Sequence, residues 1–183
     1  MIHKAWKVLD RQAVLQHPNI SVDMEAVQLP DGRVISDWPI ARTQDYVSAF
    51  VINDDGLALV LEGYRHGLGR SSWQMLGDYL HKGEDPMEGA GRILLEITGY
   101  RASSWRHLAS LVTDADQHMG VGHFFLGRNV QLMTAPSQPE QAGLYDMKWI
   151  RLGELKRALW DGRIMGASYA TTVSMGLLAL GCY

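Results

Sequence analysis

The chain has 183 residues, of which 46% are hydrophobic and 20% are charged, and this composition is ordinary for one globular domain with a substantial core. The formal net charge of −3 provides no basic field, so neither nucleic acid nor an anionic membrane is an expected partner. The single cysteine, Cys182, excludes an internal disulfide framework and a cysteine metal cluster, and it agrees with a reducing cytosol.

Neither end of the chain carries an apolar segment of the length that membrane targeting needs. The N-terminal stretch MIHKAWKVLD has no apolar signal core, and the apolar run Val173–Cys182 is too short to span a bilayer. We therefore expect a cytoplasmic protein.

Two hairpins and then a loop are predicted in the first part of the chain, because β-rich runs alternate there with turn residues. In chain order these features are a strand at Ile20–Leu29, a turn at Pro30–Arg33, a strand at Val34–Thr43, a strand at Tyr46–Ile52, a turn at Asn53–Gly56, a strand at Leu57–Leu61 and a loop at Gly63–Ser72.

Helices enter in the second part. In chain order we predict a helix at Glu84–Thr98, strands at Trp105–Val112 and Val121–Val130, a loop at Thr134–Gly143, a strand at Asp146–Arg151, and helices at Leu152–Trp160 and Ser168–Leu180. No repeat or linker marks a domain boundary. This order of elements indicates either an α+β fold or a mixed α/β/α sandwich.

The stretch GEDPMEGAGRILLEITGY, residues 83–100, specifies both ends of its helix. Asp85 can cap the first turn, Pro86 suits the first helical position, and Glu88 could complete a capping box. Gly99 stands where a left-handed residue ends a helix.

Residues 93, 96 and 97 of this helix share one face, because they are spaced i, i+3 and i+4. Three carboxylates there could converge on divalent cations such as Mg²⁺, which prefer oxygen ligands. The sequence supplies Ile93, Glu96 and Ile97 instead. The two isoleucines widen an apolar stripe that also contains Met87, Ala90 and Leu94.

A second interpretation of Glu96 is structural. Arg92 precedes Glu96 by four residues, and such a pair stabilises a helix by a few tenths of a kcal/mol. On periodicity alone we favour this ion pair over a metal site.

With these residues the chain resembles the Nudix hydrolase family, and within it the ADP-ribose pyrophosphatase branch. Aligned on the end of the family's box, the sequence keeps Glu84, Arg92, Leu94, Glu96, Gly99 and Tyr100. Asp78 takes the place of the initial glycine of the box. Ile93 and Ile97 take the places of two glutamates that are metal ligands in the family. The departures affect the metal-binding positions and leave the structural ones intact.

The resemblance extends over about 170 residues. It includes Leu61-Glu62-Gly63-Tyr64-Arg65, the segment Trp73–Asp78 in which Gln74, Leu76 and Asp78 depart from the branch, the N-terminal hairpin, and the tail from Lys148 to Ile164. It implies an α/β fold, namely a Nudix α/β/α sandwich with a mixed β-sheet at residues 46–183 and an N-terminal β-hairpin extension at residues 1–45. It also implies a homodimer, with the extension on the dimerisation and substrate side.

The resemblance further implies a nucleoside-diphosphate-type ligand. Arg65 is expected to contact its phosphate or ribose, Trp38 to stack on an adenine, and Gly77 and Asp78 to lie at the substrate. Arg65 could instead pair with Glu62 or a neighbouring carboxylate, and Trp38 could be an ordinary core or interface tryptophan. If the protein is an enzyme, Glu96 and Glu84 are its catalytic candidates, Glu96 is a metal ligand, and Mg²⁺ or Mn²⁺ is the cofactor. Arg92 and Gly99 have structural roles in the box.

Other segments offer alternatives. Asp114–His118 could present metal ligands on one side if extended, together with Asp78, or could be a solvated loop. His118 and His123 could act as an acid or base, and Glu140 lies in a loop where the branch often carries a catalytic glutamate. A surface role is favoured for each of these groups.

Three hypotheses about function remain. The first is a degenerate Nudix protein that binds an ADP-ribose-like ligand, or acts through a protein partner, with hydrolysis lost or strongly reduced. The second is an active hydrolase of an ADP-sugar-like diphosphate with a non-standard metal site. The third is a structural dimer without nucleotide binding.

Overall fold

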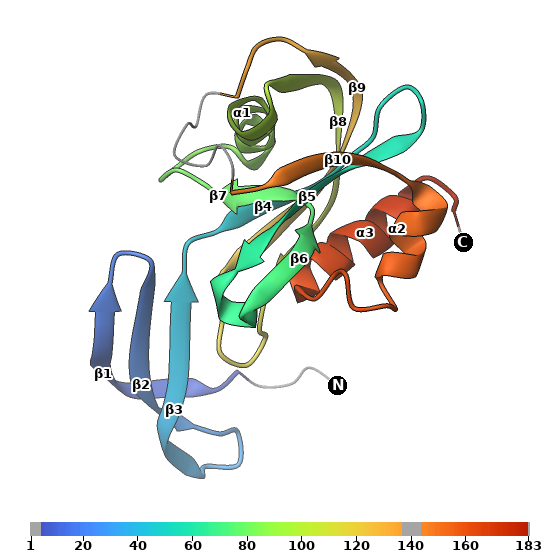
Figure 1. Cartoon of the computed structure of the whole chain (residues 1–183). Coiled ribbons are helices and arrows are strands. Elements are labelled where there is room, and N and C mark those ends of the chain that lie inside the picture. Colours follow the sequence, from blue (N-terminus) through green and yellow to red (C-terminus); the bar gives the residue numbers. More distant parts are fainter. Residues whose placement is uncertain (1–4, 137–143, 183) are drawn as a thin grey trace. The chain divides into compact units, whose positions relative to one another are not determined.

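The structure is a computed structural model that describes residues 5–136 and 144–182 (Figure 1). The chain divides into two compact units. One comprises residues 1–45 and 112–121, and the other comprises residues 46–111 and 122–183. The larger unit holds the helices and the residues of the box.

The smaller unit is an antiparallel sheet of three strands in the order β1-β2-β3. These strands are β1 (Lys7–His17), β2 (Ile20–Gln28) and β3 (Val34–Thr43). The predicted hairpin is confirmed, because Gln28 pairs with Val34 across the turn. Residues 112–121 join this unit through backbone contacts such as the Ala41 N–H donating to the Gln117 carbonyl at 2.9 Å.

The larger unit contains two sheets, one with the strand order β10-β5-β6 and one with the order β7-β4-β9-β8. The strands are β4 (Tyr46–Val51), β5 (Leu57–Arg65), β6 (Arg70–Gln74), β7 (Leu76–Tyr79), β8 (Tyr100–Val112), β9 (Val121–Leu132) and β10 (Asp146–Arg151). The helices are α1 (Pro86–Thr98), α2 (Leu152–Ala158) and α3 (Ala167–Ala179), with a short 3₁₀ turn η1 at His66–Leu68. The β4–β9 pair is parallel and the β4–β7 pair antiparallel, so the sheet is mixed.

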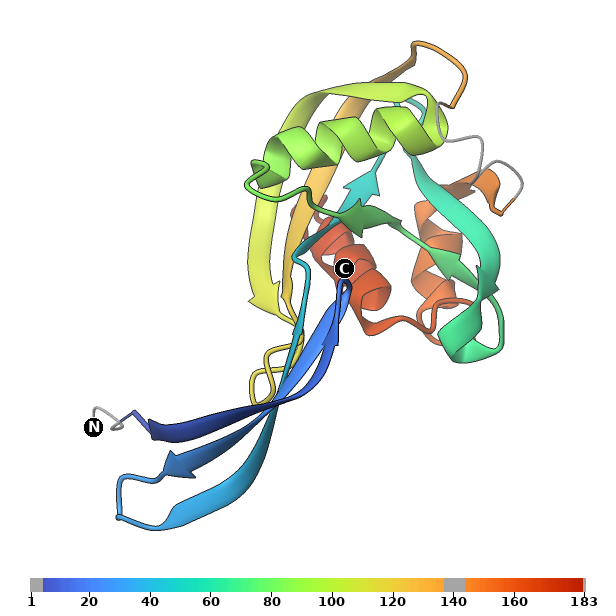
Figure 2. The ribbon, with the colours of Figure 1, turned by 90° about the vertical axis from the view of Figure 1, so that its left-hand side faces the viewer.

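Helices cover both faces of these strands. Figures 1 and 2 both place α1 on one side and α3 on the other. Each side has its own apolar core. The α1 side buries Val47, Leu59, Leu76, Ile93 and Leu94, among others. The side of α2 and α3 buries Phe50, Trp73, Met75, Leu155 and Val173, among others. The predicted α/β/α sandwich is therefore confirmed.

Two local predictions are wrong. The Asn53–Gly56 turn forms, with the Gly56 N–H donating to the Asn53 carbonyl at 3.0 Å. Its flanking strands do not make a hairpin, because β4 and β5 belong to different sheets and the pairing beside the turn is one isolated bridge, between Ile52 and Ala58. The predicted loop at Gly63–Ser72 is instead the end of β5, the turn η1 and the start of β6.

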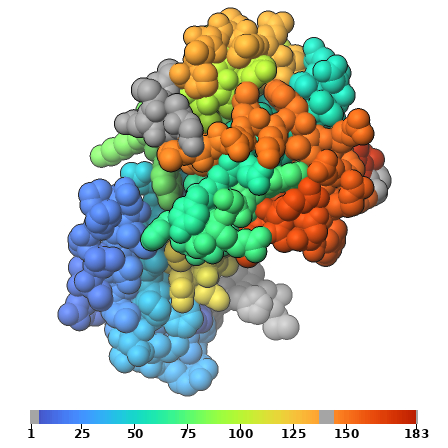
Figure 3. All heavy atoms as spheres, viewed as in Figure 1, coloured from blue at the N-terminus to red at the C-terminus, as the bar shows by residue number. Residues whose placement is uncertain are grey.

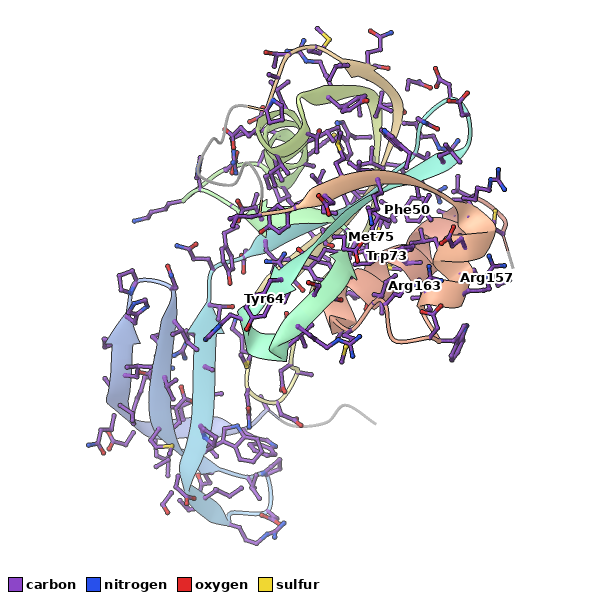
Figure 4. The ribbon with its side chains drawn as sticks, in the orientation of Figure 1. Phe50, Tyr64, Trp73, Met75, Arg157 and Arg163 are labelled. Carbon is purple, nitrogen blue, oxygen red and sulfur yellow. The ribbon has the colours of Figure 1, made fainter. Side chains whose placement is uncertain are left out.

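In Figure 3 the orange residues around β10 border the green residues of β5 and β6 on this face. The paired neighbour of β10 is β5, with Trp149 opposite Leu59, and β6 pairs with the other edge of β5. The segment after α2 is fixed to β6 by Arg163, whose guanidinium lies 4.3 Å from the centroid of the Trp73 ring, and Figure 4 shows the two side chains together. Arg65, at the end of β5, lies within this larger unit. Its neighbour Tyr64 is 59% exposed.

Candidate functional site

The ends of α1 form as the sequence predicts. The Asp85 carboxylate accepts hydrogen bonds from the backbone N–H groups of Met87 and Glu88 at 2.9 and 3.1 Å, and Pro86 opens the helix. Gly99 ends it with φ at 75°, where its N–H donates to the Leu95 carbonyl at 2.8 Å. A Cβ on Gly99 would also lie 2.0 Å from the Thr134 carbonyl oxygen, so glycine is required by both backbone conformation and space.

The two acidic candidates of the box are both held by Arg92. Its guanidinium donates to the Glu84 carboxylate at 2.6 and 2.8 Å and to Glu96 at 2.9 Å. The predicted Arg92–Glu96 ion pair is thus confirmed, and Glu84 joins it from outside the helix. The hydrogen bonds from Arg92 lower the pKa of Glu84 to about 2, and the Glu84 carboxylate raises the pKa of Arg92 in turn. This cluster of Arg92, Glu84 and Glu96 fastens the segment before α1 to the helix.

The two isoleucines of the predicted metal face are part of the packing of α1. Ile93 is 1% exposed in the core on this side of the sheet, and Ile97 is half-buried against the same core. Ala90 and Leu94 are also buried, whereas Met87 is 44% exposed, so the predicted apolar stripe is narrower at its start.

These residues do not fit a divalent-cation site of the kind the family's box provides. Aliphatic side chains offer no oxygen ligand, and both oxygens of Glu84 and one oxygen of Glu96 already accept charged hydrogen bonds from Arg92. Within residues 5–136 and 144–182, no group of three or more His, Cys, Asp or Glu side chains is arranged to hold a metal ion.

A hollow of about 250 Å³ opens beside β4, β7 and the start of α3. It is lined by Tyr46, Val47, Ser48, Arg65, Gly77, Asp78, Tyr79, Ser168 and Tyr169. A smaller hollow of about 70 Å³ shares three of these residues, Arg65, Gly77 and Asp78. Three of the predicted substrate-binding residues are therefore brought together.

Among Arg65, Gly77 and Asp78, Arg65 makes the largest number of side-chain contacts that the structure describes. It donates to the carbonyl oxygen of the Gln74 side chain, to the Tyr169 hydroxyl at 2.8 Å and to the Tyr145 hydroxyl at 3.4 Å. Its guanidinium carbon lies 5.4 Å and 5.7 Å from the centroids of the Tyr145 and Tyr169 rings. The predicted alternative, a pair with Glu62, is wrong, because Glu62 pairs with Lys148 instead.

Gly77 and Asp78 lie on β7. A Cβ on Gly77 would lie 2.5 Å from the Val47 carbonyl oxygen, so close packing of β7 on β4 accounts for this glycine. The Asp78 carboxylate accepts a hydrogen bond from the Tyr79 N–H at 2.8 Å.

Other predicted residues do not line these hollows. Trp38 belongs to the smaller unit, where its indole N–H donates to the Asp116 carbonyl at 3.2 Å and its ring meets Trp6 edge to face at 5.2 Å between centroids. Asp114–His118 is not extended, because the Asp114 carboxylate accepts the N–H groups of Asp116 and Gln117 in a turn. Glu140 lies outside the described residues.

The two predicted histidines differ in their surroundings. His118 is an exposed residue of the smaller unit with φ at 55°, and no role in acid–base chemistry follows from this position. His123 Nδ1 lies 2.9 Å from the Ser110 hydroxyl, which is also 2.9 Å from His107 Nε2.

The tyrosines around Arg65 were not predicted from the sequence. Tyr145 precedes β10 and Tyr169 lies in the first turn of α3, and neither carries a sequence pattern that marks a site. Gln74 could have been noticed in the sequence, because it differs from the residue that the ADP-ribose pyrophosphatase branch has at this position. In the structure its side chain is 1% exposed and lies beside Arg65.

Comparison with known proteins agrees with this fold. Residues 42–167 match the family described as NUDIX domain. The chain therefore belongs to the Nudix family.

Two characterised relatives are ADP-ribose pyrophosphatases. The one from Bacillus subtilis is 21% identical over 91% of this chain and 90% of its own length, and the one from Mycobacterium tuberculosis is 25% identical over 78% and 69%. A methanol dehydrogenase activator of Bacillus methanolicus is 26% identical over 81% of this chain and 77% of its own. A crystal structure of an ADP compounds hydrolase superimposes over the whole of both chains with a TM-score of 0.81 at 13% identity, which supports the fold.

No helix in the described ranges combines the length and the apolar character that crossing a membrane would take.

Proposed function

We propose that this protein binds a nucleoside-diphosphate-type ligand in the hollow around Arg65, and that metal-dependent hydrolysis is lost or strongly reduced. The observation that carries the proposal is the burial of Ile93 at 1% exposure, at a position where the resemblance implies a metal-binding glutamate. Without that ligand and its partner at position 97, the box lacks the oxygens that would hold a cation beside a diphosphate.

The ligand class is supported from two directions. The hollow presents a guanidinium, whose planar donors suit phosphate oxygens, and several tyrosine rings that can pack against a base or a sugar. Two relatives are named for the cleavage of ADP-ribose, which is a nucleoside diphosphate linked to a sugar.

The test separates binding from cleavage. ADP-ribose and a panel of ADP-sugars are titrated by calorimetry, and AMP release is measured from the same mixtures with Mg²⁺ and with Mn²⁺. We expect measurable binding of at least one compound and no release of AMP above the rate without protein. Cation-dependent release that the Glu96→Gln variant abolishes would contradict the proposal.

The second candidate is an active hydrolase of an ADP-sugar-like diphosphate, which the names of the two pyrophosphatase relatives favour. It would use Glu96, Glu84 and a ligand outside the box, with Mg²⁺ or Mn²⁺ as cofactor. It predicts AMP release in the same panel. If no compound binds and none is cleaved, the remaining hypothesis is a structural role.

A further inference from the structure

Arg65 has a cationic side chain whose hydrogen-bond partners are neutral. It donates hydrogen bonds to the Gln74 amide oxygen and to the hydroxyls of Tyr145 and Tyr169. Within the described ranges it has no carboxylate at ion-pair distance. A partly buried charge without a counter-ion is costly, and a bound anion would relieve that cost.

Two buried donors next to this charge have no hydrogen-bond partner among the described residues. They are Arg65 Nε and the Gln74 amide nitrogen, Nε2. Gln74 is 1% exposed, and its amide oxygen already accepts from Arg65, so its Nε2 lies close to the same guanidinium. An unpaired buried donor costs on the order of 1–3 kcal/mol, and such donors in a native protein call for an acceptor.

Both side chains line the hollow of about 70 Å³, together with Leu61, Gly77, Asp78, Ile97 and Tyr145. Liquid water occupies about 30 Å³ per molecule, so this hollow suits one small group and not a whole nucleotide. Because the hollow shares Arg65, Gly77 and Asp78 with the larger one, the rest of a ligand can extend there. The apolar side chains of Leu61 and Ile97 offer nothing to a cation.

Asp78 is the one carboxylate among the described residues that line this hollow, and it disfavours an anion there. Its Oδ1 is engaged by the Tyr79 N–H. A bound anion must therefore be attracted by the guanidinium and the amide more strongly than it is repelled by the Asp78 carboxylate. Charge-assisted hydrogen bonds are strong enough for this.

We infer that Arg65 and Gln74 form an oxyanion site that holds one phosphoryl group of the ligand without a divalent cation. This inference rests on the proposed function and extends it by assigning a role to Gln74 and by removing the cation from ligand binding. In effect, the cationic guanidinium of Arg65 and the neutral amide N–H of Gln74 contact the oxygens that metal ions would otherwise coordinate.

The test is a calorimetric titration with ADP-ribose in EDTA and in Mg²⁺, followed by competition with inorganic phosphate. We expect dissociation constants that agree within about twofold between the two conditions, and displacement by phosphate. Gln74→Glu should weaken binding by about tenfold or more, because its carboxylate repels the anion and pairs with Arg65. Asp78→Asn should tighten binding by several-fold, because it removes the opposing charge.

Gln74→Glu and Asp78→Asn are expected to change the affinity in opposite directions. A variant that is partly unfolded would bind more weakly, so unfolding cannot explain tighter binding by Asp78→Asn. Gln131→Glu, an exposed position on β9, makes the same charge change away from the hollow and should bind like the unaltered protein. Binding that requires Mg²⁺, or that Gln74→Glu leaves unchanged, would overturn the inference and leave the proposed function standing. Absence of binding in both conditions would remove both.

Discussion

At position 93 the side chain and its surroundings are matched. Ile93 is 1% exposed and packs against the strands on the α1 side of the sheet. A glutamate there would bury a carboxylate without a partner, which costs several kcal/mol unless a cation or a proton neutralises it.

We therefore predict that Ile93→Glu lowers the free energy of unfolding by about 3 kcal/mol in EDTA, measured by denaturant unfolding. The matched control is Ile97→Glu, one helical turn further on, where the side chain is only half-buried and lines the smaller hollow. Ile97→Glu should lower the free energy of unfolding by less than half as much as Ile93→Glu. Equal effects at the two positions would mean that burial of Ile93 is not the cause.

Single residues also show what a sequence can and cannot reveal. The caps Asp85 and Gly99 and the Arg92–Glu96 pair were predictable because they are local, with partners within a few positions along the chain. The contacts of Arg65 were not, since Gln74, Tyr145 and Tyr169 are brought to it from β6, from the approach to β10 and from α3. Periodicity contains no information about such contacts.

At the scale of elements, α1 depends on the residue that ends it. Gly99→Ala introduces a Cβ at a positive φ and 2.0 Å from the Thr134 carbonyl oxygen. We predict a loss of more than about 2 kcal/mol in unfolding free energy. Gly83→Ala is the control, because φ there is also positive at 79° but nothing lies within 4 Å of the added Cβ, so only about 1 kcal/mol of backbone strain is expected. If Gly99→Ala and Gly83→Ala lost similar unfolding free energy, the short distance between position 99 and the Thr134 carbonyl would not be the cause.

The cluster of Arg92, Glu84 and Glu96 makes stability depend on pH. Hydrogen bonds from Arg92 lower the pKa of Glu84 from 4.5 to about 2, so between these values the unfolded chain binds more protons than the folded one. Stability from this group is complete above pH 4.5 and is lost as the pH falls towards 2. We predict that Glu84→Gln makes the decline in the unfolding midpoint between about pH 5 and about pH 2.5 shallower. A decline of the same steepness in Glu84→Gln and in the unaltered protein would contradict this role of Glu84.

Most elements were predictable, and those that were missed have two physical causes. Strand β1 has every residue exposed, so it shows no alternation of buried and exposed side chains to indicate a strand. The glycines and arginines at Gly63–Ser72 indicated a loop, although pairing between β5 and β6 imposes strands on part of the segment.

At the scale of the whole molecule we propose a homodimer, with the smaller unit on the dimerisation side. The reason is that β1 is one of the two edge strands of its sheet and, with Trp6 just before it, exposes several large apolar side chains, namely Trp6, Val8, Leu9, Val14 and Leu15. Apolar side chains on an open edge are typical of a surface that another chain covers.

We predict that light scattering after size-exclusion chromatography gives the mass of two chains, and that Leu9→Lys combined with Val14→Lys gives the mass of one, because the added charges oppose burial of this edge. Gln12→Lys is the matched control, since it adds a charge at an exposed polar position of the same strand, and it should remain dimeric. A monomer of the unaltered protein at tens of micromolar would contradict the proposal.

The packing of Ile93 has a consequence for redesign. A carboxylate introduced at this position alone would lie buried with neither a cation nor a second acid beside it, and it would weaken the fold. Only a pair of acids at positions 93 and 97, bound to a cation, could offset that cost. Installing a cation site on this face of α1 therefore requires at least two simultaneous substitutions.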